Sequence, residues 1–488
     1  MLVRGILYGL IFLICVIVCL KVRSRAERQI VLLICSYILY LSWGAWFAII
    51  LLASTVMNFL VGKWLQKKPS GLVLSVGILL NLVLLGSFKY LPEIAINFPL
   101  SSLQFQRFSQ IALPLGISFW TFQAMSYLFD LYRGEELDPT FLEFALFMVF
   151  FPVVICGPIC RLPAMLPQFR AEQTTTARDI ERGLSRIATG FLMMQLAQLL
   201  GQGILSGDGI HSGFDHVRHW SGADVWCLAF GYGLQLFLDF AGYSHIAIGA
   251  AQALGFIIPE NFVRPFQSTS PSIFWTRWHM SLSFWIRDYV FLLLVVLRRD
   301  AWWRNIVLVI SMVLFGLWHK ATLLFLLWGL YHGVLLVLHR QIEAAQRKFD
   351  WSPHPALWTP ISWLATIALV SLGWIFFRAN SLADARQMWS AILSVDGYGA
   401  HALSSSLYFL VAVVALGYAI VVSVAATMDR SLVDASVSGG SAGSGVIGAL
   451  ARNRRFWVPP LYVLALLVVV AVTPKSGVNA AQLMYRNF

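Results

Sequence analysis

Long apolar runs, separated by short segments rich in lysine and arginine, constrain this chain of 488 residues more than any other feature. A stretch of about 18 or more apolar residues with few charges is long enough to cross a lipid bilayer as an α-helix. Charged residues make up only 12% of the sequence, whereas soluble domains are about 25% charged. The pattern therefore predicts an all-α protein that passes through a membrane many times.

Two of the apolar segments are interrupted by proline and glycine, in ALPLGISFW (112–120) and FFPVVICGPI (150–159), which predicts broken or re-entrant helices. Irregular backbone at membrane depth is tolerated only where it packs against protein or lines a watery cavity. The predicted apolar helices lie near residues 4–20, 29–43, 44–62, 71–89, 110–130, 141–160, 186–205, 223–256, 305–318, 321–339, 357–376, 404–424 and 456–473.

Basic clusters give the predicted orientation, because cytoplasmic loops of membrane proteins carry an excess of lysine and arginine. On that rule both chain termini lie outside the cytoplasm. Segment 305–339 has basic residues on both flanks, so it enters the membrane and returns, and His319 lies at the bend. The clusters placed in the cytoplasm lie at 21–28, 63–68, 298–304, 340–348 and 452–455.

The chain is predicted to be one membrane-embedded domain over residues 1–488. Residues 430–455 are glycine- and serine-rich and basic, which indicates a flexible cytoplasmic loop, and residues 474–488 form an extracytoplasmic tail. Residues 377–403 are predicted to be an amphipathic segment outside the cytoplasm.

Neither nucleic-acid binding nor metal binding is expected. The net charge of +12 would suggest nucleic acid for a soluble protein, but here the basic residues lie between apolar runs, as membrane topology requires. The six cysteines include no Cys-x-x-Cys pair. His211, Asp215, His216 and His219 lie close together in the sequence but match no recognised ligand spacing.

An imidazole stands in the middle of the apolar segment LFGLWHKATLLFLLWGLYHG (314–333). Polar groups inside a bilayer are costly and usually functional. Burial disfavours the charged form of His319, and a neutral histidine is a competent general base. The alternative is a structural histidine bonded to a nearby carbonyl. Lys320 is expected to extend toward the interface, and a structural role is favoured for His332.

A second histidine lies in IFWTRWHMSLSFWIRDYVF (273–291), among aromatic and charged side chains. If this segment is one helix, His279 and Ser283 share a face and Arg287 lies one turn further. The alternative is an interfacial helix whose histidine is merely hydrogen-bonded.

Asp239 lies in another apolar run, QLFLDFAGYSH (235–245). A carboxylate there is expected to pair with Arg277 or Arg264, or else to line a polar channel.

Six ordered blocks give the chain a resemblance to the membrane-bound O-acyltransferase family, in particular the bacterial branch that O-acetylates exported polysaccharides such as alginate and cellulose. The blocks are LPLGISFWTFQAMSYLFDLYRG (113–134), FFPVVICGPICRLPAMLPQF (150–169), FLDFAGYSHIAIGAAQALGFIIPENFVRPF (237–266), FWTRWHMSLSFWIRDYVF (274–291), LWHKATLLFLLWGLYHG (317–333) and GWIFFRANSLADA (373–385).

The resemblance implies a ring of about 11–13 transmembrane and re-entrant helices around a central tunnel, in the inner membrane of a bacterium. His319 corresponds to the family's catalytic histidine and His279 to its second histidine. No bound cofactor is expected; the implied donor is acetyl-CoA or another acyl thioester. The implied partners are membrane lipid, a lipase-like (SGNH) periplasmic acetyltransferase and a polysaccharide synthesis and export complex. Supporting or donor-site candidates are Trp278, Ser283, Arg287, Asp288, Asp239, Trp318 and Lys320.

Two regions bear on the substrate. RDYVF (287–291) runs directly into LLLVVLRRD, whereas relatives in the alginate branch usually carry a Pro-Leu-Gly-Gly-Asn-Arg loop there. The chain ends in MYRNF, and Tyr485 stands where relatives have a tail tyrosine, so it is a candidate acyl relay or part of an ordinary tail.

Three functions remain open from the sequence. The favoured one is transfer of an acetyl group across the membrane for O-acetylation of an exported polysaccharide. D-alanyl or long-chain acyl transfer to a cell-envelope lipid, polymer or protein is the main alternative. A transporter is the third, although the chain has no visible inverted repeat.

Overall fold

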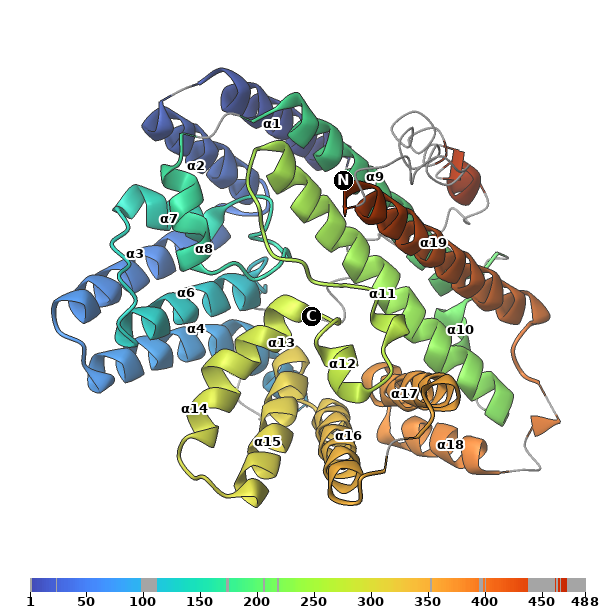
Figure 1. The fold of residues 1–488 in the computed structure, drawn as a ribbon. Helices are drawn as coiled ribbons and strands as arrows, with labels where there is room; N and C mark the ends of the chain where they lie inside the picture. The colour runs from blue at the N-terminus through green and yellow to red at the C-terminus, as the bar shows by residue number, and fades with distance from the viewer. Residues whose placement is uncertain are drawn as a thin grey trace. The chain divides into compact units, whose positions relative to one another are not determined.

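A computed structural model shows a helical protein (Figure 1), and the residues it describes contain eighteen α-helices and no β-strand. The all-α prediction is thus confirmed for these residues. A ring around a tunnel depends on how the parts of the chain are placed relative to one another, and it stays a prediction. The structure describes residues 2–22, 24–97, 112–172, 175–204, 207–216, 219–351, 353–394, 398–399, 401–437, 461, 464–465 and 467–471.

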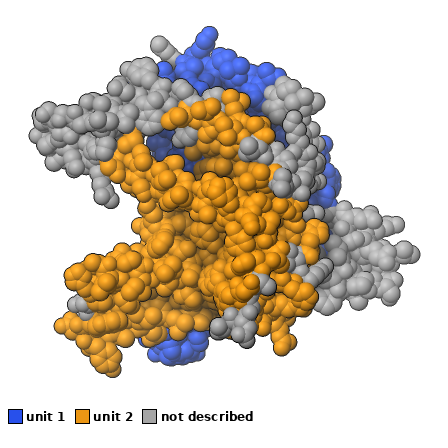
Figure 2. Space-filling model, turned by 90° about the vertical axis from the view of Figure 1, so that its right-hand side faces the viewer, with its two compact units in different colours: residues 1–187, 243–261, 278–307 blue, residues 188–242, 262–277, 308–488 orange. Residues whose placement is uncertain are grey.

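The chain forms two compact units, coloured separately in Figure 2. Each unit collects separate stretches of the sequence, and helices α9 (Ala177–Gln202), α11 (Gly222–Ala253) and α15 (Ala301–His319) contribute residues to both. Unit 1 comprises residues 1–187, 243–261 and 278–307, and unit 2 comprises residues 188–242, 262–277 and 308–488.

Seven described helices are long and apolar enough to cross a membrane, and each coincides with a predicted apolar segment. Multiple membrane passes are therefore confirmed. The last predicted helix, 456–473, lies largely outside the described residues. The seven spans are Ala45–Lys67, Gly71–Pro92, Gly222–Ala253, Ala301–His319, Leu323–Lys348, Pro355–Arg378 and Ser405–Met428.

Besides the spans α3 (Ala45–Lys67) and α4 (Gly71–Asn97), unit 1 contains further helices that lie wholly within it. They are α1 (Leu2–Lys21), α2 (Arg25–Leu41), α6 (Ile117–Tyr132), α7 (Phe141–Val149), α8 (Leu162–Arg170), α13 (Met280–Ile286), the π-helix Arg287–Phe291 and α14 (Leu292–Val295).

Two predicted helices of unit 1 are shorter than expected, because the backbone between them is irregular. The segment predicted at 110–130 becomes helical only at Ile117, after Gly116 with φ of +69°. A Cβ on Gly116 would lie 1.9 Å from the carbonyl oxygen of Val154. The segment predicted at 141–160 is helical only to Val149. The interruption predicted from proline and glycine is therefore confirmed, and the boundaries are corrected.

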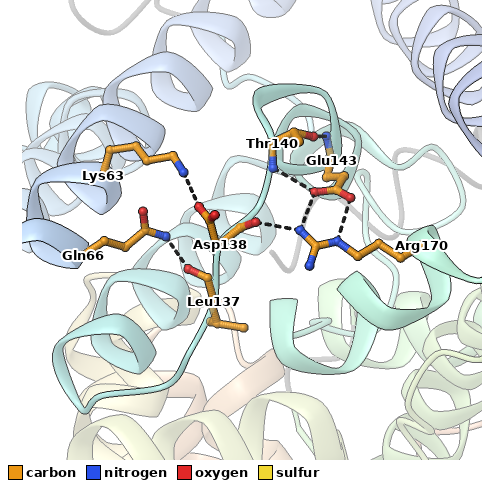
Figure 3. A network of polar contacts seen from close by, with 7 residues as sticks. All are labelled: Lys63, Gln66, Leu137, Asp138, Thr140, Glu143 and Arg170. Carbon is orange, nitrogen blue, oxygen red and sulfur yellow. Dashed lines mark hydrogen bonds and ion pairs between the residues drawn. The ribbon is translucent and has the colours of Figure 1, made fainter.

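Ionic contacts hold the loop before α7 against its neighbours in unit 1 (Figure 3). Thr140 and Glu143 form a reciprocal cap at the start of α7. Arg170 of α8 binds the Glu143 carboxylate through two nitrogens at 2.8 and 2.9 Å and also the carbonyl of Asp138. Lys63 of α3 pairs with the Asp138 carboxylate. These contacts join α3, α7 and α8.

Unit 2 contains the helical hairpin predicted from the charge pattern, made by α15 and α16 (Leu323–Lys348). The two helices approach closely at glycines: a Cβ on Gly316 would lie 2.2 Å from the carbonyl oxygen of Phe325, and one on Gly329 would lie 2.4 Å from that of Met312. Close packing of small residues is how membrane helices gain contact area.

The other elements of unit 2 precede or follow this hairpin along the chain. Helix α19 continues to Val437, so residues 430–437 are helical and only the later part of the predicted loop 430–455 lies outside the described residues. The elements are α10 (Ile210–Asp215), the 3-10 helix Pro265–Gln267, α12 (Pro271–Trp275), α17 (Pro355–Arg378), α18 (Leu382–Leu393) and α19 (Ser405–Val437).

Replacing Gly329 by valine is expected to destabilise the protein by about 1–3 kcal/mol or more, since overpacking a close contact costs that much. The measurement is thermal unfolding of the detergent-solubilised protein, followed by tryptophan fluorescence. The matched control is Gly417→Val in α19, where a Cβ has no neighbour within 4 Å. Equal unfolding temperatures for the two variants would contradict the close approach of α15 and α16.

Candidate active site

His319 is the last residue of α15, and its side chain is buried at 5% exposure within unit 2. Its imidazole stacks on Phe315, one helical turn earlier, with ring centres 5.7 Å apart and planes at 15°. The ring centre of Phe377 from α17 lies 5.0 Å from that of the imidazole, with planes at 74°, and the ring centre of Trp328 from α16 lies 5.8 Å away, with planes at 88°. Aromatic rings from three helices therefore fix the imidazole in the apolar interior of the unit.

Neighbouring residues in the sequence take different places around His319. Trp318 is buried, and its ring centre lies 4.7 Å from the imidazole, so this supporting candidate does contact His319. Lys320 follows the end of α15 and is partly buried. The rings of Trp328 and Phe377 were not singled out from the sequence, although both lie in blocks that carry the family resemblance.

His332, for which a structural role was favoured, joins the same aromatic cluster. Its side chain is completely buried on α16. The imidazole lies 5.0 Å from Trp328 and 5.2 Å from Trp275, in edge-on arrangements. Neither ring nitrogen has a hydrogen-bond partner in the described residues. Trp328 contacts both histidines, so His332 packs on the ring that in turn packs on His319.

A polar clamp at the end of α17 holds Phe377 in place. The next residue, Arg378, donates to the Asp215 carboxylate at 2.8 Å, and its guanidinium lies 5.3 Å from the ring centre of Phe214. Asn380 donates to the same carboxylate at 3.1 Å. The clamp fixes the last turn of α17, which carries the ring that packs on His319.

His279 lies in unit 1, in the short non-helical segment between two helices. Helix α12 ends at Trp275 and α13 begins at Met280, with His279 at its N-cap position in the left-handed region, φ of 42° and ψ of 51°. The segment is therefore not the single helix on which His279 and Ser283 would share a face. The Ser283 hydroxyl donates to the carbonyl of Trp278 at 3.1 Å. Left-handed geometry costs a residue with a Cβ about 1–2 kcal/mol.

His279 is buried at 2% exposure. Burial lowers the pKa of its imidazole well below the ordinary value, so the ring is neutral at pH 7. A neutral imidazole can accept a proton through one nitrogen and donate through the other. Strained backbone at a buried histidine is a recurrent feature of functional sites.

Arg287 and Asp288 begin the π-helix Arg287–Phe291, an irregular form that is frequent at functional sites. Asp288 binds both Arg287 and Arg161, each at 2.7 Å. Burial alone would raise the pKa of Asp288, but the hydrogen bonds and charges of the two arginines outweigh it and hold this pKa below its usual range. Arg133 donates to the carbonyl oxygen of Asp288 at 2.6 Å. These two donor-site candidates thus lie in one arginine-rich cluster.

Asp239 is partly buried on α11 in unit 2. Throughout the described part of the chain it forms no ion pair with Arg277 or Arg264, so that expectation is wrong. Its other suggested role, lining a polar channel, stays a prediction.

Two of the four residues weighed as metal ligands make other contacts. Asp215 belongs to the α17 clamp, and the His211 Nε2 atom lies 2.9 Å from the side-chain nitrogen of Gln235. Among the residues that the structure describes, no group of three or more histidine, cysteine, aspartate or glutamate side chains is suited to hold a metal ion. Tyr485, the candidate relay, lies outside the described residues.

Comparison with known proteins adds the family context. The sequence profile of MBOAT, the membrane-bound O-acyltransferase family, matches residues 103–377. The probable alginate O-acetylase AlgI of Pseudomonas syringae pv. tomato is 33% identical over 386 residues, covering 76% of this chain and 71% of that protein. The peptidoglycan O-acetyltransferase of Helicobacter pylori is 31% identical over 402 residues, covering 75% and 74%. The teichoic acid D-alanyltransferase of Bacillus subtilis is 30% identical over 285 residues, covering 54% and 69%.

The α17 clamp is expected to make stability depend on pH. Burial alone would raise the pKa of Asp215, but the charge of Arg378 and the hydrogen bonds from Arg378 and Asn380 hold it below its usual range. A depressed carboxyl pKa stabilises the folded protein above the unfolded-state value of about 4, and this contribution is lost as the pH falls through the folded value. The wild type should therefore lose more thermal stability than Asp215→Asn as the pH falls from about 5 to about 3. The exposed Asp300→Asn serves as control; parallel pH profiles for wild type and Asp215→Asn would contradict the clamp.

Proposed function

The chain belongs to the membrane-bound O-acyltransferase family, and from this premise we propose that it moves an acyl group from a cytoplasmic thioester to a hydroxyl group on the far side of the membrane. The acyl group is acetyl, and the final acceptor is an exported polysaccharide. The observation that carries the proposal is the buried imidazole of His319 at the end of a membrane-spanning helix.

His319 acts as the general base. It removes the proton from the acceptor hydroxyl while the oxygen attacks the thioester carbonyl. When the tetrahedral intermediate collapses, the C–S bond breaks and an ester bond has formed. The protonated imidazole returns its proton to the departing thiolate. The rings of Phe315, Trp328 and Phe377 keep the imidazole oriented and exclude bulk water, which would otherwise hydrolyse the thioester.

His279 acts on the same reaction as a second polar group, orienting the donor or stabilising the negative oxygen of the tetrahedral intermediate. Its neutral, buried imidazole suits the donation of a hydrogen bond. The candidates for contacts with the donor are sequence neighbours of His279 in unit 1, namely Trp278, Ser283, Arg287 and Asp288.

Acetyl transfer is favoured by the names of the relatives. Relatives matching about three quarters of this chain are described as alginate O-acetylases and as a peptidoglycan O-acetyltransferase. D-alanyl transfer is the second candidate, because teichoic acid D-alanyltransferases match about half of the chain.

The setting we propose is the inner membrane of a bacterium, with the basic loops in the cytoplasm. Acetyl-CoA supplies the acyl group from that side. On the other side, Tyr485 or a lipase-like periplasmic acetyltransferase receives it and passes it to the polysaccharide within a synthesis and export complex. Transport without acyl transfer is the competing function.

His319→Ala should lower acyl transfer by about 10²–10⁴-fold, the usual contribution of a general base. The measurement is release of free thiol from the donor thioester by the purified protein. His216→Ala, which changes an exposed histidine at the end of α10, is the matched control and should retain activity. Transfer at the wild-type rate by the His319 variant would refute its role as base.

The donor is tested by comparing acetyl-, D-alanyl- and palmitoyl-thioesters in the same assay, with His319→Ala as the blank for each. Acetyl thioester should give the highest kcat/KM. Preference for the D-alanyl donor would instead support the second candidate. Uptake of substrate into vesicles with no thiol release from any donor would favour a transporter.

A further inference from the structure

Asn261 stands at the centre of a buried hydrogen-bond network in unit 1. Its side chain has no exposure to solvent. Its backbone carbonyl accepts from the N–H of Met280 at 2.8 Å. Its Oδ1 atom accepts from the Ser281 hydroxyl at 2.6 Å and from the Ser281 N–H at 3.3 Å, and its Nδ2 atom donates to the Ser244 hydroxyl at 3.1 Å.

The two amides that Asn261 binds are the first two of helix α13. The first four N–H groups of a helix have no partner within it, and the side chain of the N-cap residue normally supplies one. In α13 the N-cap residue is His279, and its side chain makes no capping hydrogen bond. Asn261, twenty residues before Ser281, caps the helix from another segment instead.

The network also reaches the irregular segment 150–160, which follows α7. The Ser281 hydroxyl, which donates to Asn261, accepts from the N–H of Ile159 at 3.0 Å. The left-handed backbone of His279 is therefore bordered on its C-terminal side by two residues whose amides are both bound. A histidine in this conformation would otherwise relax toward more favourable φ and ψ values.

We propose that Asn261 is a positioning residue for His279: by capping α13 in place of the histidine side chain, it holds His279 in its left-handed geometry for the role proposed above. This inference rests on the proposed function of His279. Its chemical basis is that Asn261 accepts from the Met280 amide through its backbone carbonyl and from the Ser281 amide through Oδ1. Its Nδ2 donates to the Ser244 hydroxyl, which fixes the orientation of the side-chain amide.

Asn261→Ala removes the side-chain contacts and should lower kcat by about tenfold to hundredfold, the cost of misplacing a catalytic group by about 1 Å. Asn261→Asp keeps the acceptor atoms at the helix start and replaces the donor by a carboxylate oxygen, whose negative charge is favourable at a helix N-terminus. Its activity should therefore lie closer to wild type than that of Asn261→Ala. The matched control is Asn58→Ala. Asn58 is an equally buried asparagine of unit 1, bound to Asn81 and remote from α13 in sequence. The Asn58→Ala variant should reduce thermal stability with little change in kcat per folded molecule.

Hydrogen–deuterium exchange of the solubilised protein separates the cap from the chemistry. In Asn261→Ala the peptide covering 278–286 should exchange faster than in wild type, and in Asn58→Ala it should not. Unchanged exchange there in Asn261→Ala would overturn the capping role whatever happens to activity.

A double-mutant cycle tests whether Asn261 acts through His279. In a His279→Ala background, Asn261→Ala should cause no further loss of rate. An additional tenfold loss in that background would overturn the positioning role and leave Asn261 a purely structural residue. Wild-type activity of His279→Ala alone would remove His279 from the proposed function, and the positioning role with it, while the exchange result would still decide whether Asn261 caps α13.

Discussion

Polar groups at membrane depth have no water to bind, so each must find its partner within the chain. In unit 1, Asn58 of α3 and Asn81 of α4 exchange amide hydrogen bonds at 3.2 and 2.7 Å. The same constraint governs the irregular backbone of residues 150–160. There the Ser36 hydroxyl accepts from the N–H of Phe151, and the Ser281 hydroxyl accepts from that of Ile159. Side-chain hydroxyls thus replace the helical hydrogen bonds that this segment gives up.

The two histidines meet this constraint in different ways. His319 lies among aromatic rings from α15, α16 and α17, which supply packing and polarisable faces rather than charged groups. His279 lies at the break between α12 and α13, and Asn261 binds the first two amides of α13. Rigid packing suits a group that must receive a proton at one place.

Much of the membrane architecture was predictable because it depends on local composition. The hairpin of α15 and α16 followed from basic residues on both flanks of one apolar stretch, and prolines and glycines marked the irregular segments. The condition that residues 273–291 form one helix is not met, because the segment is broken at His279. Helical spacing cannot reveal a cap supplied by Asn261, and a left-handed histidine has no signature in a single sequence. The prediction of an ion pair for Asp239 was wrong for a related reason. The sequence of one apolar segment does not show which side chains of other segments lie beside it.

The sequence by itself determined that the chain spans a membrane, where its longest helices lie and that His319 is buried among apolar residues. Those properties follow from transfer free energies that add along a contiguous segment. Only the tertiary structure decided that Phe377 and Trp328 pack on His319, that Arg378 clamps α17 through Asp215, and that Asn261 takes over the cap of α13. Each of those contacts joins residues of different helices or segments, and its geometry is set by how these pack together rather than by the sequence neighbours of either residue.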